Sequence, residues 1–203
     1  MAVTTYALPA ATSWKFSDNI IGAADIAGVY VAGSLGAPGV TPLPSVVIEQ
    51  QLGQIVKGQS YDSTYGGTAQ FIFLAVPTST TVTQGLVYNW KGDGTIVVNP
   101  TTVSAAATSG VPVAVALNTV ASNTTSIQYT WFLVQGRGAA LKSATITAQP
   151  NAPLFISNAT AGRVRTTASA FRSFIGLRGA NVATATGSIL PVWLQFPNCG
   201  PGA

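Results

Sequence analysis

The clearest hydrophobic pattern lies in the middle of the chain, where apolar side chains recur at every second position. Residues 111–117 place valines and a leucine on one face, and a proline and alanines on the other. Residues 127–134 carry one apolar face throughout, while the opposite face changes from polar side chains to Phe132 and Val134. Since a period of two is that of a pleated strand, we expect two strands here. The second should be buried on both faces at its far end, with Trp131 in the core.

Shorter apolar segments around this pair predict further strands. Residues 71–76 form a continuous apolar run, which is typical of a central strand. Residues 86–90 and 95–99 flank the sequence Lys-Gly-Asp-Gly, and the Asp-Gly step accepts positive φ, so a tight hairpin is expected. We expect the Gly-Arg-Gly sequence at 136–138 to turn the chain. Residues 189–196 should form an edge strand, because the proline within them has no amide hydrogen for a second neighbour.

The predicted fold class is all-β, a single β-sandwich or β-barrel domain with an extended N-terminal arm. No segment sustains an apolar period of 3.6 residues, and turn signals recur about every ten residues. We assign residues 1–45 to the arm, because glycine and proline crowd its second half. Residues 46–203 form the β-domain, which ends in a short C-terminal tail. A strand that folds back onto the same domain is the alternative for the arm.

The composition indicates a protein whose surface is covered by other protein. Hydrophobic residues make up 47% of the 203 residues and charged residues only 7%, against roughly 25% charged residues in an average soluble domain. A monomer with so few charges would be poorly solvated. We therefore expect a homo-oligomer, with a trimer as the leading assembly.

The residues that usually carry catalysis or bind metal ions are scarce. The chain has no histidine, its five acidic residues stand singly along the first half, and Cys199 is the one cysteine. Histidine is the usual general base and the commonest metal ligand, and a single thiol builds neither a disulfide within the chain nor a thiolate cluster. The sequence therefore predicts a protein that is not an enzyme and that holds no cofactor and no metal.

A membrane partner is not expected. The longest apolar stretch, residues 20–40, contains Asp25 and repeated glycines, which make a poor helix, and an uncapped strand or loop cannot face lipid. The N-terminus lacks the basic start and apolar run of a signal peptide, so we do not expect export by the general secretory route.

Charge is distributed unevenly along the chain. Up to Asp93 there are five acids and three lysines, whereas the rest of the chain has six basic residues and no acid. A basic face that meets an acidic partner and sparse arginines that solubilise a β-domain explain this equally well. Candidate interface residues are the apolar anchors of the arm and the late arginines: Trp14, Phe16, Arg163, Arg165, Arg172 and Arg178.

Six segments follow one another over residues 52–180: LGQIVKG, SYDSTYGGTAQFIFL, the GLVYNW hairpin, VPVAVAL, YTWFLVQGRGAAL and FRSFIGLRG. Their order resembles that of the capsid decoration, or cement, proteins of tailed bacteriophages, which are small virion structural proteins. The resemblance implies a protein without catalytic residues that binds the outside of the major capsid protein shell, often as a trimer, and stabilises the head against the pressure of its DNA. It also implies assembly in the host cytoplasm, a final place on the capsid exterior and no direct role with nucleic acid.

Two other functions are alternatives. A receptor- or glycan-binding module of a phage tail should display aromatic platforms, for which Tyr61, Tyr65 and Tyr129 are the candidates. A shell-forming coat protein that packages RNA would normally carry a basic terminal tail, but the first 14 residues have no charged side chain.

Overall fold

The computed structural model describes the chain as a succession of β-strands, and the all-β prediction is confirmed. It describes residues 6–17, 26–32, 41–43, 51–98, 110–143, 146–157, 159–166, 172–183 and 187–202. The chain passes from a short 3-10 turn, η1 (Ala11–Ser13), through the strands β1 (Trp14–Phe16), β2 (Val29–Ala32), β3 (Thr41–Leu43), β4 (Ile55–Ser60), β5 (Gly67–Val76), β6 (Val87–Trp90), β7 (Ile96–Val98), β8 (Val113–Ala116), β9 (Gln128–Leu141), β10 (Pro153–Ile156), β11 (Val164–Arg165), β12 (Arg172–Gly179) and β13 (Ile189–Gly202).

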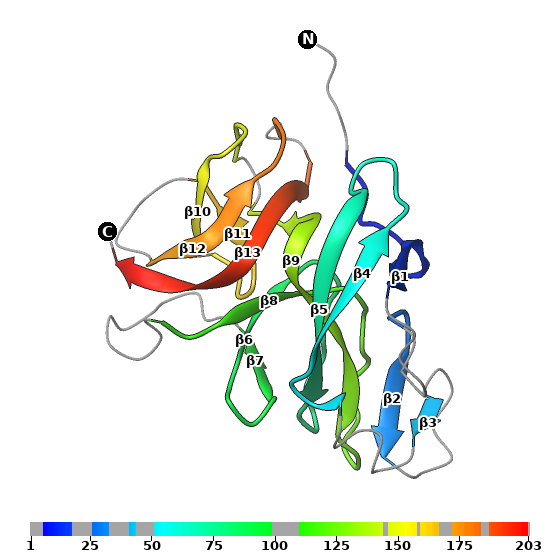
Figure 1. The fold of residues 1–203 in the computed structure, drawn as a ribbon. Helices are drawn as coiled ribbons and strands as arrows, with labels where there is room; N and C mark the ends of the chain where they lie inside the picture. The colour runs from blue at the N-terminus through cyan, green and yellow to red at the C-terminus, as the bar shows by residue number, and fades with distance from the viewer. Residues whose placement is uncertain are drawn as a thin grey trace.

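The strands form one large, mainly antiparallel sheet that is open at its ends. Its main path runs β1-β4-β5-β9-β13-β12-β10-β11, and the β6–β8 group branches from it through the pairing of β8 with β9. In Figure 1, β13, β12 and β10 lie on one side of β9, and β5, β4 and β1 on the other. The described strands do not close into a barrel, so the fold is sandwich-like.

β5 from Phe71 to Val76 and β9 from Thr130 to Val134 are buried on both faces. On one face, Phe73 and Trp131 pack with ring centroids 4.9 Å apart, together with side chains of β8, β12 and β13. On the other, Phe132 meets Tyr88 of β6 edge-on at 5.8 Å, and both contribute to a second apolar cluster. The expectation that the far end of residues 127–134 is buried on both sides is therefore confirmed, and Trp131 is fully buried.

The expected turn at 136–138 is wrong, because β9 continues straight through it to Leu141. Gly136 has a φ of 110°, and a Cβ there would lie 2.8 Å from the carbonyl oxygen of Thr68 on the neighbouring strand. The glycine therefore permits a close approach of β5 to a continuing strand. The hairpin at Lys91–Gly94 is present as expected, since β6 and β7 pair antiparallel across it and Gly94 has a φ of 77°.

The last strand is central, so its assignment to a sheet edge is wrong. β13 pairs with β9 on one side and with β12 on the other. Pro191 is tolerated because it lies opposite the point where β12 ends. Its carbonyl accepts a bond of 2.8 Å from the amide of Ala180, which follows Gly179, the last residue of β12. The proline nitrogen faces the same side, where the pairing with β12 has already ended.

The short C-terminal tail is also a wrong prediction, because β13 extends to Gly202. Cys199 is fully buried and pairs with Phe174, and its thiol lies 3.6 Å from the side-chain oxygen of Asn89. Apolar residues of β12 and β8 pack around Cys199, so its thiol is shielded from solvent.

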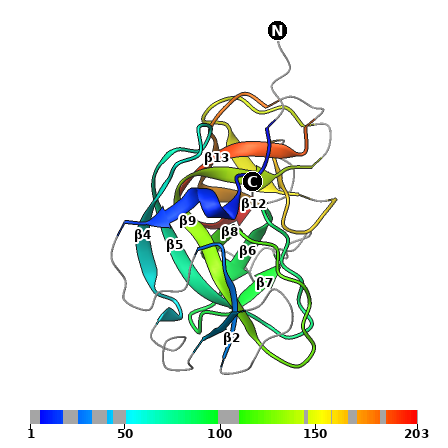
Figure 2. The ribbon, with the colours of Figure 1, turned by 90° about the vertical axis from the view of Figure 1, so that its right-hand side faces the viewer.

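The described parts of residues 1–45 belong to the domain, so the boundary at residue 45 does not separate an arm from it. β1 pairs with β4, and β2 pairs with β9. Trp14 is only 2% exposed and meets Phe71 edge-on at 5.5 Å, while Phe16 packs against Trp131 at 4.9 Å. Figure 2 shows the N-terminal segment lying in front of the central strands. The alternative that this segment folds back is the correct one.

Tyr65 fastens the N-terminal segment to the turn that joins β4 and β5. Its hydroxyl donates a bond of 2.8 Å to the carbonyl of Ala7, 58 residues away. Burial of the ring raises the pKa of Tyr65 from 10.0 to about 12, and the nearby carboxylate of Asp62 adds to the rise. The neutral phenol is therefore favoured in the folded protein.

We expect Trp131→Ala to lower the free energy of unfolding by about 3–5 kcal/mol, because it leaves a cavity between the two central strands. Urea denaturation followed by circular dichroism measures this loss. Trp193→Ala is the matched control, since that indole is 49% exposed, and its cost should be clearly smaller. Equal losses in the two variants would contradict the placement of Trp131 in the core.

Stability should fall as the pH rises from about 10 towards about 12, because the unfolded chain releases the Tyr65 proton in this range while the folded protein retains it. Burial also raises the pKa of Tyr88, so absorbance titration should show late tyrosinate ionisation whose amplitude Tyr65→Phe lowers by one tyrosine. Tyr61→Phe, whose ring is 68% exposed, should retain this late step. A late ionisation of unchanged amplitude in Tyr65→Phe would refute the assignment.

Candidate ligand-binding groove

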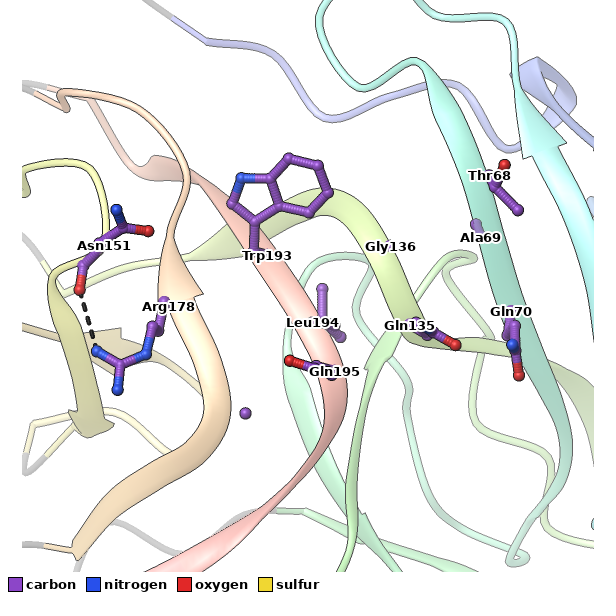
Figure 3. Close-up of a pocket in the computed structure, with 11 residues that line it drawn as sticks. Thr68, Ala69, Gln70, Gln135, Gly136, Asn151, Arg178, Trp193, Leu194 and Gln195 are labelled. Carbon is purple, nitrogen blue, oxygen red and sulfur yellow. Dashed lines mark hydrogen bonds between the residues drawn. The ribbon is translucent and has the colours of Figure 1, made fainter.

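A groove crosses four neighbouring strands, β5, β9, β13 and β12 (Figure 3). It lies on the face of the sheet opposite the cluster that contains Phe73 and Trp131. Its volume of about 520 Å³ is within the usual range for pockets that take small ligands. The residues that line it are Thr68, Ala69, Gln70, Gln135, Gly136, Asn151, Gly176, Arg178, Trp193, Leu194 and Gln195.

Three glutamines form one row across the groove. Gln135 of β9 is paired with Gln70 of β5 on one side and with Gln195 of β13 on the other. Directly paired residues project to the same face with their Cβ atoms about 5 Å apart, so the three amides are neighbours. Figure 3 shows them in a line across the three strands. We call these residues the glutamine row.

A second row of different chemistry lies beside the glutamine row. Trp193 of β13 is paired with Arg137 of β9 and with Arg178 of β12. Its strand neighbours Val192 and Leu194 are buried in the core, so the indole projects to the outer face, where half of it is exposed. Positions two apart on one strand share a face about 7 Å apart, which places this row next to the glutamines.

Glycine bulges shape the walls of the groove. Residues 195–197 of β13 lie opposite the single Gly176 of β12, whose φ is 77°. A Cβ at Gly176 would lie 2.5 Å from the carbonyl oxygen of Gln195, so only glycine fits. On β13 the same bulge holds Phe196 at a φ of 46°, a conformation that bulky residues rarely adopt. Such bulges bend and twist strands, and here they curve the sheet around the groove.

Hydrogen-bond partners fix the two arginines. One Nη of Arg137 donates to the side-chain oxygen of Asn181 at 2.7 Å, and its guanidinium carbon lies 5.8 Å from the centre of the Trp193 ring. One Nη of Arg178 donates to the carbonyl of Asn151 at 3.2 Å, and the guanidinium of this exposed side chain is turned towards Asn151 (Figure 3). The groove is therefore positively charged, and none of its lining residues is acidic.

Two polar atoms beneath the groove are buried and lack a protein partner among the described residues. They are the side-chain oxygen of Gln135 and the Nε of Arg137. A buried polar atom without a partner costs about 1–3 kcal/mol, so such atoms usually meet a water molecule or a ligand. Gln135 lines the groove, so its side-chain oxygen is an acceptor there that the described residues do not satisfy, whereas Arg137 lies outside the lining.

The predicted interface residues do not form one group. Trp14 is buried in the core, so its expected role as an interface anchor is wrong, and Phe16 packs on the core beside it. Among the arginines, Arg178 lines the groove, whereas Arg163 donates to the carbonyl of Lys142 at 3.1 Å and is partly buried. Arg165 is partly buried in β11, opposite Phe155. The side chain of Arg172 lies outside the described residues.

None of the expected aromatic platforms lines the groove. Tyr65 is buried, Tyr129 stacks on Phe73 at 6.0 Å, and Tyr61 is exposed on the turn after β4. The aromatic residue that lines the groove is Trp193, which lies in a strand that reads as apolar throughout and is not among the expected platforms. Its alternation with Val192 and Leu194 was the available signal.

Lys142 lies at the end of β9 and is fully buried. Its ammonium donates to the carbonyl of Ile146 at 3.0 Å, and burial lowers its pKa. Next to it, the hydroxyls of Ser143 and Ser157 are hydrogen-bonded at 2.5 Å, and Ser157 also accepts from the amides of residues 159 and 160. These bonds join the segments around β10 and β11, so we assign Lys142, Ser143 and Ser157 a structural role.

The groove has the chemistry of binding. Amides, guanidinium groups and an indole donate and accept hydrogen bonds or stack, and none is a general acid or base near neutral pH. In the part of the chain that the structure describes, no three His, Cys, Asp or Glu side chains come together in a way that could hold a metal ion. No helix among the same residues is both long and apolar enough to cross a bilayer.

No protein-family model and no curated protein matches the chain.

Gly176→Ala should lower the free energy of unfolding by about 1–3 kcal/mol, because alanine is strained at a φ of 77° and its methyl group would press on the Gln195 carbonyl. Gly92→Ala is the matched control, since a Cβ there meets nothing within 4 Å. Urea denaturation of the two variants measures the difference. A Gly176→Ala protein as stable as the control would contradict the bulge geometry.

Proposed function

We propose that the protein is a virion structural protein without enzymatic activity that decorates and stabilises the head of a tailed bacteriophage from outside. In this proposal it binds the major capsid protein shell as a homo-oligomer, with a trimer as the expected state. Support comes from the order of six sequence segments over residues 52–180 and from a chain with 7% charged residues. The all-β fold is compatible with this function but does not distinguish it from others.

The observation that carries the proposal is a group of exposed apolar side chains around the carboxyl end of β5. Ile55, Val97 and Ile127 are each between 43% and 46% exposed. We call these three residues the apolar end. Exposed apolar residues that gather at one end of a weakly charged protein favour a protein interface there.

Strand pairing brings these residues to one end of the sheet. Ile55 is paired with Ile72 in the second half of β5. Ile127 precedes Gln128, which is paired with Val76, the last residue of β5. Val97 follows Thr95, which bridges to Ala75. The three exposed side chains therefore come from three segments, β4, β7 and the start of β9, that meet β5 near its carboxyl end.

Attachment to a shell needs an interface of the order of 1,000 Å², more than three side chains supply. The apolar end is therefore the centre of a larger surface, where truncation of buried apolar residues costs most. We propose these residues as the interface anchors in place of Trp14, because the indole of Trp14 is buried in the protein's own core.

We expect the triple variant Ile55→Asp, Val97→Asp, Ile127→Asp to bind heads at least about tenfold more weakly than the unchanged protein, because three carboxylates would have to be desolvated in an apolar interface. The assay is co-sedimentation with phage heads that lack the protein, with folding checked by circular dichroism. Tyr61→Asp is the control, since it adds a carboxylate at an exposed aromatic site beside the other end of β5.

Two outcomes would contradict the proposal. If the unchanged protein does not bind heads but is recovered with tails, it is a tail module. If the triple variant binds heads as tightly as the control, the apolar end is not the attachment surface.

A further inference from the structure

We propose that the groove between the glutamine row and Trp193 is a binding site for a carboxylated saccharide, a sugar that carries an acidic group such as a uronate. The inference is drawn from the groove alone and does not require attachment to a head. It assigns a second, separate surface of the protein to ligand binding.

Trp193 supplies the platform. Pyranose rings present a flat face of C–H groups that packs against an indole, and the Trp193 side chain is half exposed at the groove. Arg137 lies over the same ring, 5.8 Å from its centre, and is itself held by Asn181. The indole is thus supported by a fixed cation and keeps one orientation, which lowers the entropy lost on binding.

The glutamine row supplies hydrogen bonds that match neighbouring hydroxyls. Each side-chain amide offers one acceptor and two donor hydrogens, while each sugar hydroxyl both donates and accepts. The oxygen of Gln135 is buried without a partner among the described residues, so a ligand hydroxyl that donates to it would satisfy a bond that is otherwise missing. Three amides side by side suit a ring with several adjacent hydroxyls better than they suit an apolar ligand.

Arg178 selects for an acid. It is the direct cross-strand neighbour of Trp193, its side chain is exposed, and one of its Nη atoms donates to the Asn151 carbonyl. Figure 3 shows the guanidinium turned towards Asn151, so a rotation of this exposed side chain would bring its remaining N–H groups to a carboxylate on a sugar ring that lies on the indole. No acidic residue lines the groove, so nothing there repels such a ligand.

The position of the groove keeps it accessible when the opposite end of the sheet is covered. It includes Thr68 near the amino end of β5, whereas the apolar end surrounds Val76 at the carboxyl end. Thr68 and Val76 are eight residues of extended strand, or about 26 Å, apart. Ile55 lies nearer the groove, since it is paired with Ile72, two residues from Gln70. If the shell contacts the protein around Val76 and Ile127, which is the function proposed above, Trp193 and the groove on β13 and β12 remain free to meet polysaccharide on a host surface.

The test is calorimetric titration of the full chain with trigalacturonic acid and with its fully methyl-esterified form, which differ in charge and share the ring hydroxyls. A printed panel of uronate, sialylated and neutral glycans widens the search. We expect binding of carboxylated glycans, at least about tenfold weaker for Trp193→Ala and partly restored in Trp193→Phe, which keeps a stacking ring. Tyr61→Ala should bind as the unchanged protein does, because Tyr61 lies outside the groove.

Arg178→Gln separates acid recognition from general sugar binding. This variant should weaken binding of the acid about tenfold and leave binding of the methyl ester unchanged, because only the acid pairs with the guanidinium. Failure of every carboxylated glycan to bind at millimolar concentration overturns the proposal. So does equal affinity for acid and ester that Arg178→Gln does not alter. Neither result bears on binding to heads, which the apolar-end variants test separately.

Discussion

Burial of β5 and β9 on both faces is the constraint on which the rest of the structure depends. Phe73 and Trp131 fill one side, and Phe132 with Tyr88 fills the other. A strand covered on both faces cannot shift its register without exposing one apolar set or the other, so this pair fixes the position of every strand attached to it. β4 and β1 extend the sheet from β5, and β13, β12 and β10 extend it from β9.

The groove arises where this double burial ends. Up to Val134 both faces of β9 are covered, whereas Gln135 and Arg137 project to an outer face that no other strand covers among the described residues. Gly136 allows β5 to stay close to β9 where the double burial ends, and Gly176 permits the bulge between β12 and β13. The polar rows thus arise because β9 extends beyond the apolar cluster of Phe132 and Tyr88.

Local sequence patterns predicted the central strands and the 91–94 hairpin, because periodic burial and an Asp-Gly turn are determined by neighbouring residues. They failed where long-range pairing decides the outcome. Gly136 was expected to break a strand, but its partner β5 keeps the strand intact; Pro191 was expected at an edge, but it sits where β12 ends. Trp14 was expected in an arm because nothing in residues 1–45 indicates that Phe71 covers it.

The candidate site was harder to predict than the fold. Gln70, Gln135 and Gln195 stand 65 and 60 positions apart in the sequence, and only the register of three strands makes them neighbours. Of the expected interface residues whose side chains the structure describes, Arg178 alone lines the groove. A single polar residue in an apolar strand marks an outward position, but its partners on other strands are set by the fold.

We propose two separate binding surfaces, the apolar end for a capsid shell and the groove across β5, β9, β13 and β12 for a ligand. Cryo-electron microscopy of heads with the protein bound, at a resolution that traces β5, tests this most directly. We predict that the carboxyl end of β5, with Ile55 and Ile127, contacts the shell and that Trp193 faces solvent. A map in which Trp193 and the glutamine row are buried against the shell would contradict the account.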